Sequence, residues 1–115
     1  MKVWMTFNPG CGTARNVLAA IRAKGIEPEV REYLKQPLTA DEITALVAKM
    51  GVPLKDVVRW KQEKEVAASG ITPDSTDAAL LGALTDFPVL LNRPIVVTEK
   101  GAALCRPAET VNQLL

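Results

Sequence analysis

Residues 3–15 read Val3-Trp4-Met5-Thr6-Phe7-Asn8-Pro9-Gly10-Cys11-Gly12-Thr13-Ala14-Arg15. The first five residues alternate like a strand, and from Ala14 onward apolar residues recur at helical spacing as far as Ile21. Cys11 therefore lies between the end of a strand and the start of a helix. The unpaired N–H groups of a first helical turn and the helix dipole both stabilise a thiolate at such a place.

The loop around Cys11 has the composition of an anion-binding loop. Pro9 and the two glycines keep large side chains away, and glycine permits backbone conformations in which several N–H groups point at one anion. The candidates for this anion loop are Gly10, Gly12, Thr13 and Arg15. The alternative is a tight turn in which Cys11 is only a small buried residue.

Composition limits the class of protein. A chain of 115 residues with 48% hydrophobic content can form one compact domain, which we expect to span residues 1–115. The 14 basic and 13 acidic residues give a net charge of +1, which argues against general binding to nucleic acid. No apolar run reaches membrane-spanning length and no leader pattern is seen, so we expect a cytoplasmic protein that binds no membrane. With two cysteines and no histidine, the sequence disfavours a disulfide and any structural metal site.

The segments after the Cys11 loop continue as a helix and a strand. The first helix is predicted over 13–24, because Gly25 then ends the helical pattern. Segment 27–33 is typical of a short edge strand, since Pro28 cannot donate to a strand ladder. The N-terminal part is therefore predicted to fold as β-α-β.

The middle third is predicted to be a helical insertion. Thr39 and Glu42 have the spacing of a capping box, and the helix that they open is expected to end at Gly51. A short helix is predicted over 53–58, and residues 60–70 are polar and charged. A further helix opens at Ser75 or Thr76, with Ala79, Leu80 and Leu84 on one side.

The C-terminal part predicts a hairpin over 94–105 with a turn at 99–101, followed by a last helix opened by Pro107. A parallel first strand pair joined to this hairpin gives an α/β protein, with a small mixed four-stranded sheet flanked by helices. This arrangement is thioredoxin-like. The fold alone does not establish the function.

Three separated motifs resemble the glutaredoxin-coupled arsenate reductases of bacteria. They are Asn8-Pro9-Gly10-Cys11-Gly12-Thr13-Ala14-Arg15-Asn16, Leu91-Asn92-Arg93-Pro94-Ile95-Val96-Val97 and Leu104-Cys105-Arg106-Pro107. Their joint occurrence in this order over nearly the whole chain is far more specific than any one of them. The resemblance implies a thioredoxin-like fold with a helical insertion, Cys11 as the nucleophile, and an oxyanion bound by Arg59, Arg93 and Arg106.

The resemblance also implies the reaction and its partners. The Cys11 thiolate attacks arsenate and forms a covalent adduct, and glutathione then releases arsenite and leaves a mixed disulfide that glutaredoxin resolves. Glutathione acts as a cosubstrate, no cofactor is expected to be bound, and we expect a monomer. Planar guanidinium groups match pairs of oxygens on a tetrahedral anion. This chemistry explains why arginines would bind the anion, independently of the family resemblance.

Each arginine also has a structural alternative. Arg59 could be a helix residue whose stem packs on the core, and the segment after it, 60–65, matches the family poorly. Arg106 could form only a surface ion pair. Arg93 precedes a proline at the place where thioredoxin-like folds have a cis-proline, so we expect a cis bond between Arg93 and Pro94.

The second cysteine and the residues around Cys11 argue against a dithiol mechanism and against a phosphatase-like mechanism. Cys105 ends an apolar run, where burial as a small apolar residue is favoured over a role as a resolving thiol. The chain has no Cys-x-x-Cys pair, since Ala14 occupies the second position. It also lacks the Cys-x5-Arg loop of phosphatase-like reductases, because Val17 stands where the arginine would be.

Phe7 departs from the family pattern, because relatives commonly carry histidine at that position and this chain has no histidine. Since an imidazolium would favour the thiolate, its absence leaves two other functions open. One is a thioredoxin-like interaction or regulatory protein, for example a transcription regulator that contacts RNA polymerase. The other is a glutathione-dependent thiol transferase that acts on another substrate.

Overall fold

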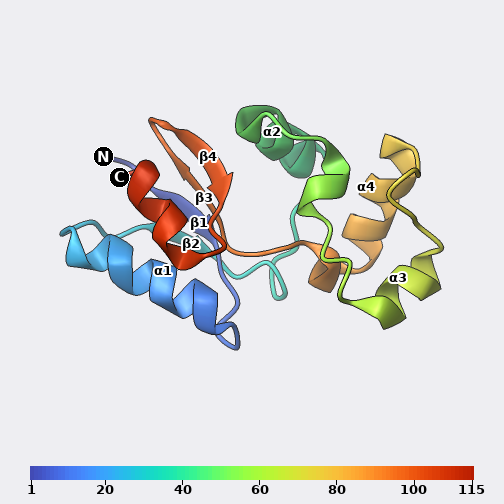
Figure 1. Ribbon diagram of the computed structural model, residues 1–115, viewed down its shortest axis with the longest axis horizontal. Coiled ribbons are helices and arrows are strands. Elements are labelled where there is room, and N and C mark those ends of the chain that lie inside the picture. Colours follow the sequence, from blue (N-terminus) through green and yellow to red (C-terminus); the bar gives the residue numbers. More distant parts are fainter. The chain divides into compact units, whose positions relative to one another are not determined.

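The computed structural model describes residues 1–115. Along the chain the elements are β1 (Trp4–Thr6), α1 (Gly12–Ala23), β2 (Glu29–Arg31), α2 (Ala40–Met50), η1 (Leu54–Val57), α3 (Glu63–Ser69), α4 (Asp77–Asp86), η2 (Pro88–Leu90), β3 (Ile95–Thr98), β4 (Gly101–Leu104) and η3 (Ala108–Gln113), where η marks a 3-10 helix (Figure 1). The predicted order of a β-α-β unit, several helices, a hairpin and a last helix is confirmed, although the last helix is the 3-10 helix η3.

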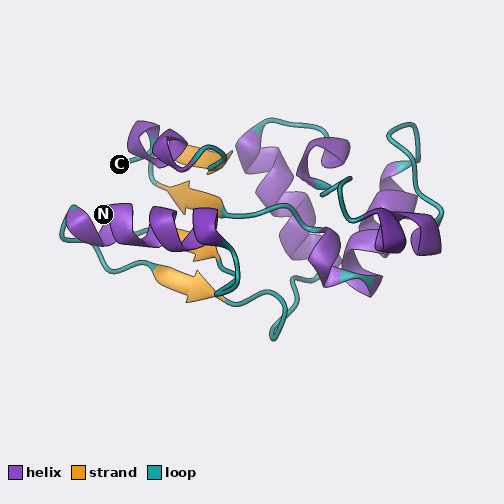
Figure 2. Ribbon diagram, turned by 60° about the horizontal axis from the view of Figure 1, so that its bottom comes forward, coloured by secondary structure: helices purple, strands orange, loops and turns teal.

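The chain divides into two compact units. The first combines Met1–Gln36 with Arg93–Leu115, and the second is Pro37–Asn92. All four strands belong to the first unit, whereas the second contains helices and the segments that connect them (Figure 2). The second unit is thus the helical insertion that the sequence predicts. That residues 1–115 act as one domain stays a prediction.

The four strands form one mixed sheet in the order β2-β1-β3-β4. Strands β1 and β2 pair in parallel, while the β1–β3 and β3–β4 pairs are antiparallel. Strand β2 lies at an edge, as the proline before it predicts. The sheet therefore has the predicted topology.

The β3–β4 turn is one residue shorter than the sequence suggests. Thr98 pairs with Gly101, so only Glu99 and Lys100 lie in the turn. Gly101 opens β4 with φ of 144°, a conformation that residues with a side chain rarely adopt. The expected turn at 99–101 is wrong by this residue, because glycine is the first member of the strand.

Helices α1 and η3 contact each other and contribute to one apolar cluster with the sheet. We name this the sheet core. Its buried members are Val3, Met5, Val17, Ile21, Val96, Cys105, Val111 and Leu114. The predicted apolar face of α1 is therefore confirmed, although Leu18 on the same helix is only half-buried.

The insertion follows its local sequence signals closely. Thr39 and Glu42 form the predicted capping box, with hydrogen bonds of 2.9 and 3.1 Å, and α2 ends at Gly51 with φ of 70°. The segment 53–58 forms the 3-10 helix η1, and the charged segment contains α3, which the pattern did not predict.

Thr76 caps α4, since its side chain accepts a hydrogen bond from the Ala79 N–H at 3.2 Å. The predicted apolar side of α4 is partly wrong. Leu80 and Leu84 are buried as expected, but Ala79 is exposed and Ala83 is buried in its place. On a helix with 3.6 residues per turn, Ala83 points about 60° away from Leu80, whereas Ala79 points about 100° away from Leu80 and about 140° away from Leu84.

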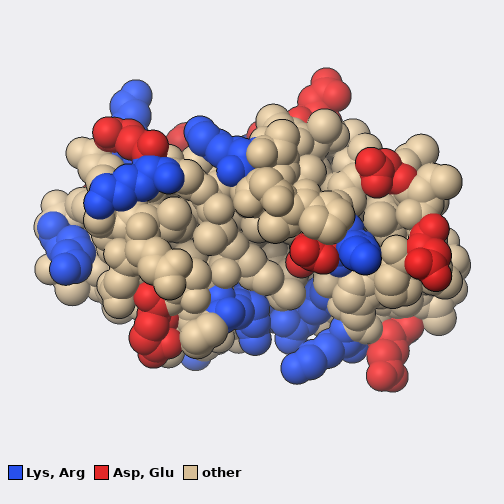
Figure 3. All heavy atoms as spheres, turned by 45° about the horizontal axis from the view of Figure 1, so that its top comes forward, with Lys and Arg blue, Asp and Glu red and all other residues tan.

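Basic and acidic side chains both occur across the face shown in Figure 3, in keeping with the nearly balanced charge. None of the helices combines the length and apolar character needed to cross a membrane.

Candidate active site

Cys11 is the residue that immediately precedes α1, in an extended conformation with φ of −97° and ψ of 116°. Its N–H donates to the carbonyl oxygen of Asn8 at 2.9 Å, and its carbonyl accepts the first helical hydrogen bond from Arg15 at 3.0 Å. The predicted position of Cys11, between strand end and helix start, is confirmed. The N–H groups in the first turn of α1 have no carbonyl acceptor within the helix, and they lie next to the cysteine.

The side chain of Asn8 shapes the loop. Its Oδ1 accepts a hydrogen bond from the Gly10 N–H at 2.9 Å. A Cβ atom at Gly10 would lie 3.3 Å from that same oxygen, which is a tight contact. At Gly12 the corresponding distance, to Nη2 of Arg15, is 3.7 Å, which is ordinary van der Waals contact. A side chain at position 10 would therefore crowd the Asn8 side chain, which explains the glycine there. Position 12 has ordinary space for a Cβ atom.

Asn8 belongs to the first motif, but the sequence alone does not assign it a function. The signal was present, because asparagine commonly accepts a hydrogen bond from the backbone two residues later in a turn. The structure shows this hydrogen bond to Gly10. Asn8 is therefore the residue that holds the loop shape ahead of Cys11.

The arginines of the second and third motifs meet at the Cys11 sulfur. Nη1 of Arg106 lies 3.8 Å from Sγ of Cys11 and donates to the carbonyl oxygen of Arg93 at 3.2 Å. The side chain of Arg93 also acts on the cysteine, because its guanidinium lowers the pKa of the thiol. One thiol thus faces two guanidinium groups that come from distant parts of the sequence.

The hairpin explains why these arginines converge. Ile95 pairs with Leu104, so Arg93 and Arg106 lie just outside the same end of the β3–β4 ladder. The N–H of Cys105 extends the pairing by donating to the carbonyl oxygen of Pro94 at 2.8 Å. The cis bond predicted between Arg93 and Pro94 is present, and the bond between Arg106 and Pro107 is cis as well.

The surroundings of Cys11 favour its charged form. Burial acts to raise the pKa of the thiol, but the Ala14 N–H and the side chains of Arg93 and Arg106 outweigh it, so the pKa is lowered. No side-chain cap hydrogen bond is formed at the start of α1, so Ala14 contributes as part of the helix N-terminus. A cysteine with a low pKa beside two arginines is a nucleophile suited to an anionic substrate.

Cys105 has the opposite environment. Its side chain is fully buried in the sheet core, and burial raises the pKa of its thiol to about 11. The thiol is 3.7 Å from the carbonyl oxygen of Ala103. This is the small buried residue that its position at the end of an apolar run favours.

Arg59 belongs to the second unit, whereas Cys11 belongs to the first. Its backbone N–H donates to the carbonyl oxygen of Leu90 at 2.7 Å, and Nη1 lies 3.4 Å from Oδ1 of Asn92. Val58 and Leu91 form a β-bridge beside these bonds. Asn92, a partner that the sequence did not reveal, thus contacts the Arg59 guanidinium. A role for Arg59 toward the anion stays a prediction.

The remaining candidates lie at the start of α1. Arg15 is exposed and donates from Nη1 to the carbonyl oxygen of Pro9 at 2.8 Å, so its charge is held over the loop. Thr13 is half-buried in the first turn. Binding of an anion by these residues also stays a prediction.

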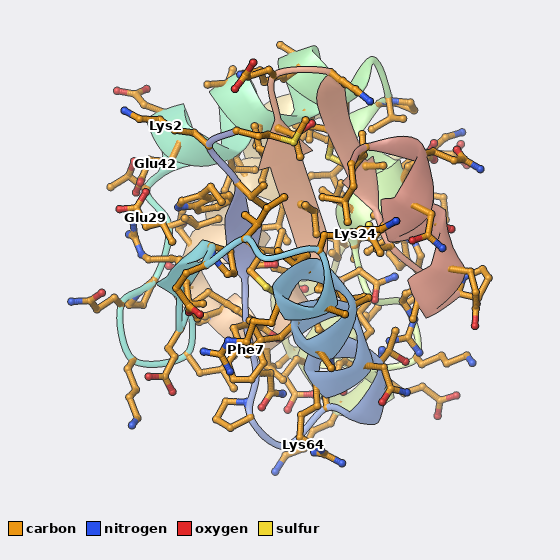
Figure 4. All side chains as sticks on the ribbon, turned by 90° about the vertical axis from the view of Figure 1, so that its left-hand side faces the viewer. Lys2, Phe7, Lys24, Glu29, Glu42 and Lys64 are labelled. Atoms are coloured by element: carbon orange, nitrogen blue, oxygen red, sulfur yellow. The ribbon has the colours of Figure 1, made fainter.

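Phe7 follows β1 and is labelled in Figure 4. Its ring is half-buried and packs against the sheet core. The position that carries histidine in the family pattern is therefore used here for apolar packing. Positive charge near the Cys11 thiol is supplied by Arg93 and Arg106 instead.

Comparisons with known proteins agree with this geometry. The model of the ArsC family matches residues 7–114. An arsenate reductase of Rhizobium meliloti (strain 1021) is 43% identical over 115 residues, covering 100% of this chain and 82% of the relative. An arsenate reductase of Escherichia coli (strain K12) is 43% identical over 109 residues, covering 94% of this chain and 77% of the relative.

A solved structure supports the same assignment. The arsenate reductase from Vibrio cholerae superposes with a TM-score of 0.90 at 33% identity, covering 100% of this chain and 98% of that one. The mixed four-stranded sheet flanked by helices is accordingly that of a thioredoxin-like fold. The chain belongs to the ArsC family.

Proposed function

We propose that this protein is an arsenate reductase that converts arsenate to arsenite. The observation that carries the proposal is the Cys11 thiol at the start of α1, with a lowered pKa and the Arg106 guanidinium 3.8 Å from its sulfur. Relatives that are 43% identical over nearly the whole chain are named arsenate reductases. The site and the family thus support the same reaction.

The proposed binding step uses the positive groups around the sulfur. Arg93 and Arg106 contact oxygens of the tetrahedral anion in place of their present contacts with the thiol, and Arg59 is the proposed third arginine. Guanidinium groups suit this task because they stay charged and present paired N–H donors. The N–H groups of Gly12 and Thr13 in the first turn would add donors from the anion loop, with Gly10 keeping the approach open.

The proposed first chemical step is nucleophilic. The Cys11 thiolate attacks arsenic(V), a sulfur–arsenic bond forms, and one arsenate oxygen leaves as water after protonation. The arginines stabilise the negative charge on the remaining oxygens. The product of this step is a covalent adduct in which arsenic is still As(V).

The proposed second step supplies the electrons. The thiolate of glutathione attacks the Cys11 sulfur, so a sulfur–sulfur bond forms and the sulfur–arsenic bond breaks with its electron pair left on arsenic. Arsenic is thereby reduced to As(III) and leaves as arsenite, while two thiols are oxidised to a mixed disulfide. Glutaredoxin then regenerates the Cys11 thiol by exchange.

An external thiol is proposed because the chain offers no suitable second one. Cys105 is fully buried and its pKa is raised to about 11, so little of it is thiolate near neutral pH. Glutathione as cosubstrate and glutaredoxin as partner follow from this reasoning together with the resemblance. Reduced glutathione is a cytoplasmic reductant, which fits the predicted location, and we propose that the protein acts as a monomer without a bound cofactor.

Arsenate turnover with glutathione and glutaredoxin tests the proposal. The wild type should form arsenite, and Cys11→Ser should form none, because serine without a strong base is a poor nucleophile toward arsenic. Cys105→Ala is the matched control and should retain most activity.

Mass spectrometry after a single turnover without glutaredoxin should find glutathione attached to Cys11. A wild type that forms no arsenite with any thiol donor would favour the interaction-protein alternative. Thiol exchange on an unrelated disulfide substrate without arsenite formation would favour the thiol transferase.

A further inference from the structure

A buried hydrogen bond between a side chain and the backbone joins β1 to β3. The N–H of Ile95 donates to Oγ1 of Thr6 at 2.9 Å. Both residues are completely inaccessible to solvent. Because water cannot replace the partner of a buried N–H, this hydroxyl is the group that satisfies it.

The hydroxyl acts at the point where the two strands separate. Trp4 pairs with Val97 and Met5 with Val96, so Thr6 and Ile95 would be the next pair of the β1–β3 ladder. The ladder ends before them, and the Thr6 side chain supplies the acceptor in place of a backbone carbonyl. On its other side β1 continues, since Thr6 still pairs with Arg31 of β2.

The bond connects the backbone segments that carry the reactive groups. Thr6 ends β1 and leads through the loop to Cys11, whereas Ile95 follows the cis-linked Arg93 and Pro94 directly. The carbonyl oxygen of Pro94 in turn accepts from the Cys105 N–H at 2.8 Å, which ties in the segment leading to Arg106. The link between Cys105 and Pro94 joins two backbone groups. The link between Thr6 and Ile95, in contrast, depends on a side chain.

We propose that Thr6 is a positioning residue for Arg93. Its hydroxyl holds the start of β3 so that the Arg93 side chain reaches the Cys11 sulfur and favours the thiolate. The proposal rests on the proposed role of Cys11 as nucleophile. Its decisive readout is the pKa of the Cys11 thiol, which can be measured without arsenate turnover.

The test compares four proteins in the Cys105→Ala background, so that Cys11 is the single thiol. They are the Cys105→Ala parent, Thr6→Val, Thr6→Ser and Thr98→Val. Valine keeps the shape of threonine but removes the acceptor, whereas serine keeps the hydroxyl. Thr98 is the matched control, because it is a buried threonine in the same sheet whose Oγ1 donates to the Leu114 carbonyl at 2.8 Å and accepts from Lys100 at 3.1 Å.

The measurement is the rate of Cys11 alkylation against pH, with folding checked by circular dichroism. Thr6→Val should raise the midpoint by about one pH unit, which means a roughly tenfold smaller thiolate fraction at lower pH. Thr6→Ser should keep the midpoint of the parent, and Thr98→Val should lose thermal stability without moving it. Arsenate kcat/KM should fall in Thr6→Val and return in Thr6→Ser.

Three outcomes would overturn the proposal. They are an unchanged midpoint in Thr6→Val, a Thr6→Ser midpoint as high as that of Thr6→Val, and an equal rise in Thr98→Val. If Thr6→Val does not fold, Thr6→Ala removes the same acceptor and carries the same expectation. If the midpoint rises in Thr6→Val but the parent protein reduces no arsenate, the role of Thr6 is supported and the proposed function is contradicted. Failure of the Thr6 proposal can therefore be told apart from failure of the proposed function.

Discussion

Nη1 of Arg106 lies 3.8 Å from the Cys11 sulfur, although 95 positions separate the two residues in the sequence. The same nitrogen donates to the carbonyl oxygen of Arg93 at 3.2 Å. The guanidinium is therefore held by the backbone of one arginine while it faces the thiol. Because a guanidinium stays protonated at any relevant pH, this arrangement gives the sulfur a permanent positive neighbour.

Replacing Arg93 or Arg106 with lysine should raise the pKa of the Cys11 thiol and lower arsenate kcat/KM. An ammonium retains the charge but cannot reproduce a planar pair of donors, so we expect a loss of about tenfold or more in each variant. Steady-state kinetics and Cys11 alkylation against pH provide the measurement. Arg22→Lys is the control, since Arg22 is exposed and its contact is with Glu27 at 2.9 Å. Unchanged kinetics in Arg93→Lys or Arg106→Lys would show that the residue has only a structural role.

Arg59→Lys should weaken arsenate reduction and leave the Cys11 alkylation profile unchanged. The groups that lower the pKa of Cys11 are Ala14, Arg93 and Arg106, whereas Arg59 contacts Asn92 in the second unit. A higher KM for arsenate with an unchanged thiol pKa would support a role in binding the anion. Kinetics equal to the wild type would instead favour the alternative in which the Arg59 stem only packs on the core.

The pKa of the Cys11 thiol should lie below the ordinary value for cysteine, and alkylation of the thiol should respond to oxyanions. Since its pKa is lowered in the folded protein, the thiolate fraction rises as pH increases through this lowered pKa and is lost below it. Sulfate or phosphate should slow alkylation by competing for the arginines. Alkylation of Cys105→Ala against pH, with and without each anion, provides the measurement.

Phe7→His completes that experiment. Phe7 packs against the sheet core, so the change should cost some stability while adding a titratable group beside the loop. We expect only a small further decrease of the Cys11 pKa, because Arg93 and Arg106 already favour the thiolate. A normal thiol pKa in wild type that falls only in Phe7→His would show that the arginines do not replace the missing imidazole.

Cys105 should make the folded protein sensitive to alkali. Burial raises the pKa of its thiol from 9.0 to about 11. Below about pH 9 the thiol is protonated in both states, whereas between about pH 9 and 11 the unfolded chain loses the proton first and unfolding is favoured. The free energy of unfolding should therefore fall across this window by up to about 2 kcal/mol more than in Cys105→Ala. Denaturant titrations of both proteins at pH 8 and 10.5 measure the difference; parallel losses would contradict the assignment.

The sequence by itself determined the local features of this protein. The alternation before Asn8 and the helical spacing after Cys11 predict β1 and α1, and the capping box at Thr39 predicts the start of α2. These signals lie within one or two turns of the residues that they govern, so backbone propensity and hydrogen bonding decide them. The errors are local too: α3 begins in a charged segment without an apolar face, and the alanine on the buried side of α4 is Ala83 instead of Ala79.

Only the tertiary structure decided which atoms meet at the sulfur. A hairpin flanked by Arg93 and Arg106 predicts that both arginines lie near one end of the sheet, but not that one nitrogen of Arg106 faces both Cys11 and the Arg93 carbonyl. Nor does the sequence reveal that the Thr6 hydroxyl replaces a ladder acceptor for Ile95. The contacts of Arg106 with Cys11 and of Thr6 with Ile95 join residues that are 95 and 89 positions apart. Their geometry follows from strand register and packing, which local propensity does not specify.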